Sequence, residues 1–366
     1  MKTALVYNPE IKNYNFGKGH PFTSERFENF INFLKEKLSN FKDYFEEITP
    51  EPATKEDLKL AHSQEYIEAM EKASAGIILP NIFQYTTVDN LDPSTGYLPR
   101  GIDWATRVAV GTSLAAAKLV LEGKFKKAIS VGGGLHHAKR KRGEGFCIYN
   151  DVAICAKKLL KKGVKRILIL DTDAHAGNGT AEAFYEENQV LFVDIHQDPR
   201  TLYPGTGFIN EAGKEKGEGF TINIPLPPGA SDDSYQYVFE EIIFPIAKEF
   251  QPEIIIRNGG SDPHFADGLT NLGLTLEGFK MIGEKVRRLS KEVCGEKEVD
   301  LIASGYNQKI LPLAWSALIS GLLNIEIKLK EPFPTKAPAK NYKLEETKEI
   351  VKELKSYLKE YWKCFQ

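Results

Sequence analysis

The sequence has little that would tie it to a membrane, to nucleic acid or to an oxidising compartment. No apolar run is long enough to cross a bilayer, and a formal net charge of −2 over 366 residues excludes bulk electrostatic affinity for nucleic acid. The four cysteines form no Cys-x-x-Cys pair, and a chain of this size needs no disulfides. We therefore expect a cytoplasmic protein with buried or incidental thiols and with no nucleic-acid or membrane partner.

Short apolar runs alternate with amphipathic stretches along the chain. The first run turns polar at Asn8 and Glu10 and is typical of a strand rather than a secretory signal. Several runs are apolar at nearly every position, as parallel strands covered on both faces are, so the alternation predicts an α/β fold with a parallel sheet. The predicted strands are Thr3–Tyr7, Lys127–Val131, Arg166–Leu170, Val190–Ile195, Thr221–Ile224, Glu253–Arg257 and Asp300–Ala303, and the predicted helices are Ser24–Leu38, Trp104–Leu121, Asp151–Leu160, Ser231–Glu249, Leu276–Val293 and 344–362.

The most informative segment follows the apolar run 167–170. Asp171, Asp173 and His175 stand at alternate positions, and alternate side chains share one face of an extended chain. Carboxylate and imidazole groups are ligands for a divalent metal such as zinc. Gly177 and Gly179 follow, and glycine permits tight turns and close backbone approach. The segment therefore predicts a metal-dependent enzyme.

Three further polar clusters follow predicted strands, at 132–137 (GGGLHH), 259–262 (GGSD) and 305–307 (GYN). Ligands of an open parallel sheet bind beyond the carboxyl ends of its strands, so we expect all four clusters to meet at one edge. Taken singly, each could be a turn, a satisfied polar group or ordinary packing. Together they predict a metal hydrolase, and five of the seven histidines lie in or beside these loops: His136, His137, His175, His196 and His264.

The segments 133–139 (GGLHHAK) and 145–151 (GFCIYND) resemble the histone deacetylase superfamily, which includes acetoin-utilisation proteins and acetylpolyamine amidohydrolases. The resemblance is collinear from about residue 19 to about residue 325, and motifs this long are specific. It extends to 171–180 (DTDAHAGNGT), 203–207 (YPGTG), 260–262 (GSD) with 267–269 (DGL), 305–306 (GY), and 19–21 (GHP) with Arg26.

This resemblance implies the arginase/deacetylase fold, an α/β architecture of three layers (α/β/α) with a parallel sheet of about eight strands. We expect one deacetylase domain, residues 1–366, in which 329–366 form a C-terminal connector and a helix packed on it. The resemblance also implies zinc-dependent amide hydrolysis with Asp173, His175 and Asp262 as the zinc ligands. Ferrous iron is the alternative ion, and water and the substrate carbonyl take the open positions of such a catalytic site.

Carried over residue by residue, the resemblance pairs His136 with Asp171 and His137 with Asn178. A carboxylate partner favours an imidazolium, whereas an amide partner does so much less. We therefore expect His137 to be the general base for water and then the acid for the leaving amine, with His136 acting electrostatically. Tyr306 is expected to donate a hydrogen bond to the oxyanion.

Four residues match the narrow substrate channel of the family: Gly145, Phe146, Tyr203 and Leu269. The aromatic faces of Phe146 and Tyr203 would grip an aliphatic stem by apolar contact. The alternative for both rings is ordinary core packing.

The sequence departs from the family pattern at a few positions. Many relatives have a second histidine where this chain has Ala176, and a glycine where it has Ala303 or Ser304, whose side chains could narrow the cavity or shift the tyrosine that follows. The family also carries a structural potassium site, which the resemblance places near Asp171. Asp194 stands where many relatives have serine, so we expect it to tighten or alter cation binding there.

The predicted function is hydrolysis of an acetylated amine: acetyl-lysine in a peptide or protein, an acetylpolyamine or another small acetylated molecule. Asn178 in place of aspartate resembles class II deacetylases and acetylpolyamine amidohydrolases, whereas Asp89 or Asp92 on loop 81–99 discriminates poorly between substrates. One alternative is a binuclear manganese ureohydrolase, which would need more bridging carboxylates. The other is a non-catalytic acetyl-ligand-binding protein, which would be expected to lose Tyr306 or a histidine. The sequence leaves the oligomeric state open.

Overall fold

The fold is built on one sheet of eight parallel strands. The computed structural model describes residues 2–333 and 342–366. The strands are β1 (Thr3–Val6), β2 (Phe45–Ile48), β3 (Lys127–Val131), β4 (Ile167–Asp171), β5 (Val190–Gln197), β6 (Thr221–Leu226), β7 (Ile254–Gly259) and β8 (Glu298–Ile302). Their order across the sheet is β2-β1-β3-β8-β7-β4-β5-β6, and each pair of neighbours is parallel.

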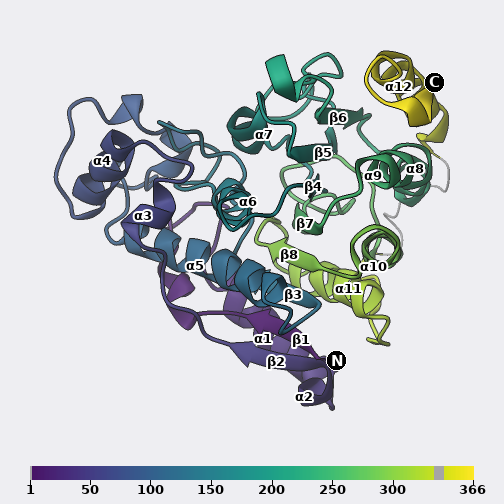
Figure 1. Cartoon of the computed structure of the whole chain (residues 1–366). Helices are drawn as coiled ribbons and strands as arrows, with labels where there is room; N and C mark the ends of the chain where they lie inside the picture. Colours follow the sequence, from purple (N-terminus) through teal and green to yellow (C-terminus); the bar gives the residue numbers. More distant parts are fainter. Residues whose placement is uncertain (1, 334–341) are drawn as a thin grey trace.

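Helices cover both faces of this sheet. They are α1 (Arg26–Lys37), α2 (Phe41–Tyr44), α3 (Lys55–Leu58), α4 (Gln64–Ser74), α5 (Ile102–Leu121), α6 (Asp151–Lys161), α7 (Asn178–Phe184), α8 (Asp232–Val238), α9 (Phe244–Phe250), α10 (Leu276–Cys294), α11 (Leu311–Leu323) and α12 (Leu344–Leu358). Figure 1 shows α5, α6 and α7 on one side of the sheet and α8, α9, α10 and α11 on the other. The predicted three-layer α/β/α fold with about eight parallel strands is confirmed.

The central strands are buried along their whole length. Every residue of β4 and of β7 is buried, and burying one large aliphatic side chain contributes about 1.5–3 kcal/mol. The charged Arg257 of β7 is accommodated because Asp300 of β8 lies beside it, with 3.2 Å between Nε and Oδ2. An unpaired charge at that depth would be strongly destabilising.

Helix α10 shows how the outer layer is specified. Its buried residues include Phe279, Ile282, Val286 and Leu289, which lie on one face at helical spacing. The side chain of Thr275 accepts a hydrogen bond from the backbone of the first turn, as helix N-caps do. The helix stops at a glycine with a φ of 63°, where a side chain would be disfavoured.

The seven predicted strands coincide with observed strands to within two residues. The predicted helix 231–249 is divided into α8, a π-helical segment (Phe239–Ile243) and α9. The last predicted helix is α12, where Thr347 Oγ1 donates to Ser234 Oγ at 2.8 Å. The predicted connector at 329–343 falls partly on 334–341, which lie outside the described residues.

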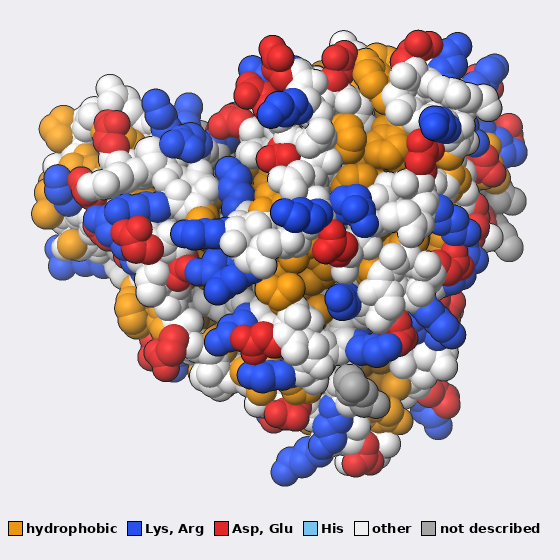
Figure 2. All heavy atoms as spheres, in the orientation of Figure 1, with side chains coloured by type: hydrophobic (Ala, Val, Ile, Leu, Met, Phe, Trp, Pro, Cys, Tyr) orange, Lys and Arg blue, Asp and Glu red, His pale blue; other side chains and the backbone are white. Residues whose placement is uncertain are grey.

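The outer surface carries charges of both signs. Figure 2 shows Lys and Arg side chains interspersed with Asp and Glu over one face, in keeping with the net charge of −2. Within 2–333 and 342–366, no helix has the length and apolar character needed to span a bilayer.

Candidate active site

The site forms where four neighbouring strands of the sheet end. Strands β3, β8, β7 and β4 are adjacent and parallel, so their carboxyl ends meet at one edge. The loops that leave them carry the four polar clusters of the sequence, at 132–137, 305–307, 259–262 and 171–175. Strand order therefore gathers side chains that are far apart along the chain.

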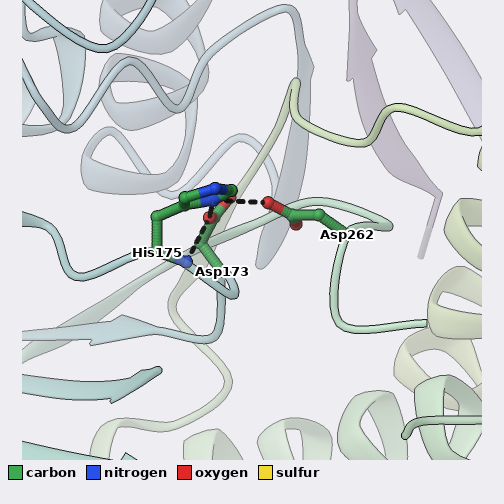
Figure 3. Close-up of side chains that lie close together, drawn as sticks. All are labelled: Asp173, His175 and Asp262. Atoms are coloured by element: carbon green, nitrogen blue, oxygen red, sulfur yellow. Dashed lines mark hydrogen bonds and ion pairs between the residues drawn. The ribbon is translucent and has the colours of Figure 1, made fainter. Parts of the chain in front are cut away.

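Asp173, His175 and Asp262 converge at this edge, and all three are buried (Figure 3). The Nδ1 atom of His175 lies 3.0 Å from Asp173 Oδ1 and 3.0 Å from Asp262 Oδ2. One ligand atom from each residue lies within 4.8 Å of the other two. Zinc binds such atoms at about 2.0–2.2 Å, which places them about 3.3 Å apart in a tetrahedron. The spacing of the three side chains fits one divalent ion.

The charges of the cluster also fit a cation. Burial, and then the charge of Asp173, raise the pKa of Asp262 to about 8. Burial alone would lower the pKa of His175, but its contacts with both carboxylates raise it to about 10. A divalent ion would relieve the repulsion between the carboxylates and take the lone pair of a neutral imidazole. Three protein ligands leave a position open, which suits a catalytic rather than a structural ion.

His136 is an imidazole held by a carboxylate. Its Nδ1 lies 2.8 Å from Asp171 Oδ2, and that oxygen also accepts a hydrogen bond from Asn258 Nδ2 at 2.9 Å. Burial alone would lower the pKa of His136, but the carboxylates of Asp171 and Asp173 outweigh burial and raise it to about 9. The carboxylate partner therefore favours the imidazolium form of His136.

His137 is held by an amide instead. Its Nδ1 lies 2.8 Å from Asn178 Oδ1. Burial, with the neighbouring charges of His136 and His175, holds the pKa of His137 well below its usual value. The two Nε2 atoms of His136 and His137 lie 3.1 Å apart. An imidazolium can only donate in such a contact, whereas a neutral imidazole can accept through its unprotonated nitrogen. The contact is therefore compatible with a protonated His136 beside a neutral His137.

Tyr306 lies on the loop after β8, with its ring centroid 6.1 Å from that of His175. Asp267 accepts hydrogen bonds from the backbone N–H groups of Tyr306 at 2.8 Å and Leu269 at 2.9 Å, so it joins two loops of the site. Burial and the charge of Asp262 raise the pKa of Tyr306 well above its usual value. The phenol therefore keeps its proton and remains a hydrogen-bond donor.

A narrow cavity of about 20 Å³ lies among these groups. Of the four predicted channel residues, Gly145 and Phe146 line it. Tyr203 is 44% exposed and packs edge-on against His137, with ring centroids 5.1 Å apart. Leu269 is 42% exposed. The structure thus places Phe146 inside the site, Tyr203 against the imidazole and Leu269 on the surface.

Ala303 and Ser304, two departures from the family pattern, both line this cavity. The hydroxyl of Ser304 contacts Asp173 Oδ2 and lies 3.1 Å from Asp262 Oδ1. Those are the carboxylate oxygens that do not face His175 Nδ1. Ser304 therefore not only reduces the volume of the cavity but also contacts both carboxylates of the ligand cluster through its hydroxyl.

Two of the five loop histidines lie outside the cavity lining. His196 is buried, and its Nδ1 lies 3.0 Å from Asp194 Oδ1, while Asp194 Oδ2 accepts a hydrogen bond from Gly177 N at 2.8 Å. His264 pairs with Glu331, with 3.2 Å between Nε2 and Oε1. The extra carboxylate at position 194 thus has an imidazole partner within the protein.

Sequence reasoning did not single out three polar residues that hold the site. Asn258 supports Asp171, as described above. Asp151 accepts the backbone N–H groups of Gly134 at 2.9 Å and Leu135 at 2.7 Å and so fixes the histidine loop. Glu144 accepts a hydrogen bond from the side chain of Asn178. The only signal in the sequence was that each is a polar residue within or beside a motif.

The strand order, the ligand cluster and the paired histidines define a class: hydrolases that hold a catalytic metal at the carboxyl edge of a parallel α/β sheet. The model of the histone deacetylase domain matches residues 20–322. The chain belongs to the histone deacetylase family, as its motifs indicated, and it is a deacetylase, a hydrolase that acts on acetyl amides.

Individual relatives agree with this assignment. The acetoin utilization protein AcuC of Staphylococcus aureus (strain MRSA252) is 36% identical over 327 residues, which cover 88% of this chain and 82% of that protein. A probable deacetylase of Archaeoglobus fulgidus is 34% identical over 375 aligned positions, covering 100% of both chains. The crystal structure of the HDA15 HD domain matches with a TM-score of 0.83 at 25% identity, covering 100% of this chain and 96% of that one.

Proposed function

We propose that the protein is a zinc-dependent deacetylase that hydrolyses the acetyl amide of an acetylated amine, either acetyl-lysine in a peptide or an acetylpolyamine-like small molecule. One observation carries the proposal: a three-residue ligand cluster lies beside two contacting histidines whose pKa values shift in opposite directions. The shifts are to about 9 for His136 and well below the usual value for His137. Amide hydrolysis needs both a neutral base and fixed positive charge at one site.

Asp173, His175 and Asp262 would hold the ion, which when bound lowers the pKa of water and polarises the acetyl carbonyl. His137 accepts the proton of the attacking water at Nε2, because its Nδ1 is engaged by Asn178. The same nitrogen then delivers the proton to the leaving amine.

His136 is held by Asp171, which favours its imidazolium form and helps to raise its pKa to about 9. In this role it opposes the negative charge that develops on the substrate. Tyr306 lines the cavity, and its phenol donates a hydrogen bond to the oxyanion of the substrate. Phe146, which lines the same cavity, excludes water from the reacting amide and contacts the aliphatic stem of the substrate.

The two alternatives are less well supported. Among residues 2–333 and 342–366, the one cluster of three or more ligand side chains is Asp173, His175 and Asp262, which favours a single ion over a binuclear manganese ureohydrolase. A non-catalytic binding protein would not need Tyr306 and both histidines in place. Zinc rather than ferrous iron, the potassium ion near Asp171, the cytoplasmic location and the single domain 1–366 stay predictions.

The test is turnover of the metal-loaded protein on two substrates, an acetyl-lysine peptide and an acetylated polyamine, with the bound metal identified by elemental analysis. We expect acetate release from at least one substrate and its loss in a His137→Ala variant that still binds metal. A preference between the substrates would name the substrate class. Absence of acetate release from both substrates by fully metal-loaded protein would contradict the proposal.

A further inference from the structure

The general-base candidate has a partner beyond Asn178. Asn178 Nδ2 donates a hydrogen bond to Glu144 Oε1 at 2.5 Å, while Asn178 Oδ1 faces His137 Nδ1 at 2.8 Å. The side chain of Glu144 is only 10% exposed, and the same Oε1 lies 3.1 Å from Lys139 Nζ. A continuous polar chain therefore runs from Lys139 through Glu144 and Asn178 to the imidazole.

An asparagine alone would orient His137 weakly. The two ends of an amide have similar shape, and either its oxygen or its nitrogen can face a histidine. If the nitrogen of Asn178 faced Nδ1, the ring would carry its hydrogen on Nε2 instead. Nε2 could then accept no proton from water, and the base would be lost.

A carboxylate behind the amide removes this ambiguity. An ionised carboxylate only accepts hydrogen bonds, so Glu144 requires the nitrogen of Asn178 on its side. The oxygen of Asn178 must then face His137, which places the ring hydrogen on Nδ1 and the lone pair on Nε2. His137 Nε2, which lies 3.1 Å from His136 Nε2, is then the ring nitrogen that carries the free lone pair.

We propose that Glu144 is a positioning residue for the general base, because it fixes the amide of Asn178 and thereby the tautomer of His137. The inference rests on the proposed function, in which His137 is the base. It adds a specific role for a residue that precedes the channel glycine. His137 has no carboxylate as a direct partner, but Glu144 provides one on the far side of the Asn178 amide.

The first experiment is a reciprocal exchange at positions 144 and 178. Glu144→Gln keeps the shape of the side chain but lets either amide end face Asn178, so we expect kcat to fall about tenfold or more with KM changed less than about twofold. Asn178→Asp alone would set two carboxylates at a 2.5 Å contact and should also be impaired. The double variant Glu144→Gln/Asn178→Asp restores one carboxylate and one amide and so fixes the tautomer again. We expect its kcat, measured at the pH optimum of each variant because the carboxylate now beside His137 raises the pKa of that imidazole, to recover at least about threefold over Glu144→Gln.

A merely structural role of Glu144 would not produce this rescue. The matched control is Glu182→Gln, an exposed glutamate on the same helix α7, one turn beyond Asn178, for which we expect unchanged kcat. Full activity of Glu144→Gln, or a double variant no better than the two single variants, would overturn the proposal.

The second experiment reads the tautomer without a substrate. In zinc-loaded protein labelled with ¹⁵N-histidine, the His137 signals should show a hydrogen on Nδ1 and a lone pair on Nε2. In Glu144→Gln we expect a mixture of tautomers, and in the double variant a return to the Nδ1–H form. An unchanged tautomer in Glu144→Gln would overturn the role of Glu144 even if the enzyme is active. A changed tautomer in a protein without acetate release would support it while the proposed reaction failed.

Discussion

The hydroxyl of Ser304 lies 3.1 Å from Oδ1 of Asp262, one of the two carboxylates that face His175. The same hydroxyl contacts Asp173 Oδ2, so a single side chain orients both carboxylates of the ligand cluster. Partners of this kind fix the rotation of a metal-binding carboxylate, and their loss typically weakens metal binding about 10–100-fold.

Ser304→Ala should therefore raise the dissociation constant for zinc by about 10–100-fold, measured by competition with a chromogenic chelator. The matched control is Ser320→Ala, because the Ser320 hydroxyl donates to the Ile325 carbonyl at 2.6 Å, at the end of α11. Equal affinities in the Ser304 variant and the original protein would show that the hydroxyl does not orient the ligands.

Tyr306→Phe should leave zinc binding intact and reduce deacetylation by about two or more orders of magnitude, the usual effect of removing an oxyanion donor. The phenol lines the cavity but is not a member of the ligand cluster. Chelator competition and steady-state kinetics on the same preparation would separate the two effects. Turnover equal to that of the original protein would remove Tyr306 from the mechanism.

The small cavity predicts selectivity for the acetyl group. The cavity volume is about 20 Å³, and one water already needs about 10–15 Å³, so there is little room for an acyl chain longer than acetyl. We expect kcat/KM on a butyryl-lysine peptide to be at least about tenfold lower than on the matching acetyl peptide. Ser304→Gly should reduce the difference in kcat/KM between the two peptides, because it removes a side chain that lines the cavity. Equal rates on the two peptides in the original protein would contradict this account.

His62 should make the fold sensitive to acid. It is buried, its Nε2 accepts the backbone N–H of Asn150 at 2.9 Å, and burial lowers its pKa to about 3. Unfolded His62 titrates near 6.5, so its contribution is present above that pH and is lost as pH falls below it. Between pH 7 and pH 5 the free energy of unfolding should drop by about 2 kcal/mol from this group.

Urea unfolding at pH 7 and pH 5 would measure this drop in the original protein and in His62→Gln at the same metal content. The variant has no imidazole at this position, so its drop should be smaller by the contribution of His62. A loss of stability that is the same at both pH values does not affect this comparison, because only the drop between pH 7 and pH 5 is compared. Equal drops in the free energy of unfolding in the two proteins would mean that His62 is not held neutral in the folded protein.

The sequence predicted the buried strands, whose residues form apolar runs, and missed strand β2, whose residues do not. The runs 167–170 of β4 and 254–256 of β7 are apolar at every position and were recognised for that reason. Strand β2 lies beside β1 at the edge of the sheet, and its central Glu46 and Glu47 are exposed. An edge strand with charged side chains resembles a polar turn when only local pattern is read.

Helix α11 was missed for the opposite reason. Most of its residues are buried, among them Trp315, Ile319 and Leu322, so it has no alternation between an apolar and a polar face. A helix that is apolar all round lacks the 3.6-residue signal from which amphipathic helices are recognised.

Within the site, motifs predicted which residue types meet but not how their supports are arranged. Asp173, His175 and Asp262 were identifiable because metal binding constrains their chemistry. The contacts of Ser304 and Glu144 join loops that are 131 and 34 positions apart. Such contacts depend on side-chain placement across the folded sheet, which local periodicity does not encode.

The position of β8 has a consequence for how the enzyme is made. Among the described strands this one comes last in the sequence, yet it lies between β3 and β7 in the middle of the sheet. On the ribosome, β2-β1-β3 and β7-β4-β5-β6 cannot be bridged until residues 298–302 emerge, and Tyr306 follows four positions later. A chain that ends before β8 lacks both the strand that joins β3 to β7 and Tyr306, so its catalytic loops cannot be aligned as they are in the complete sheet.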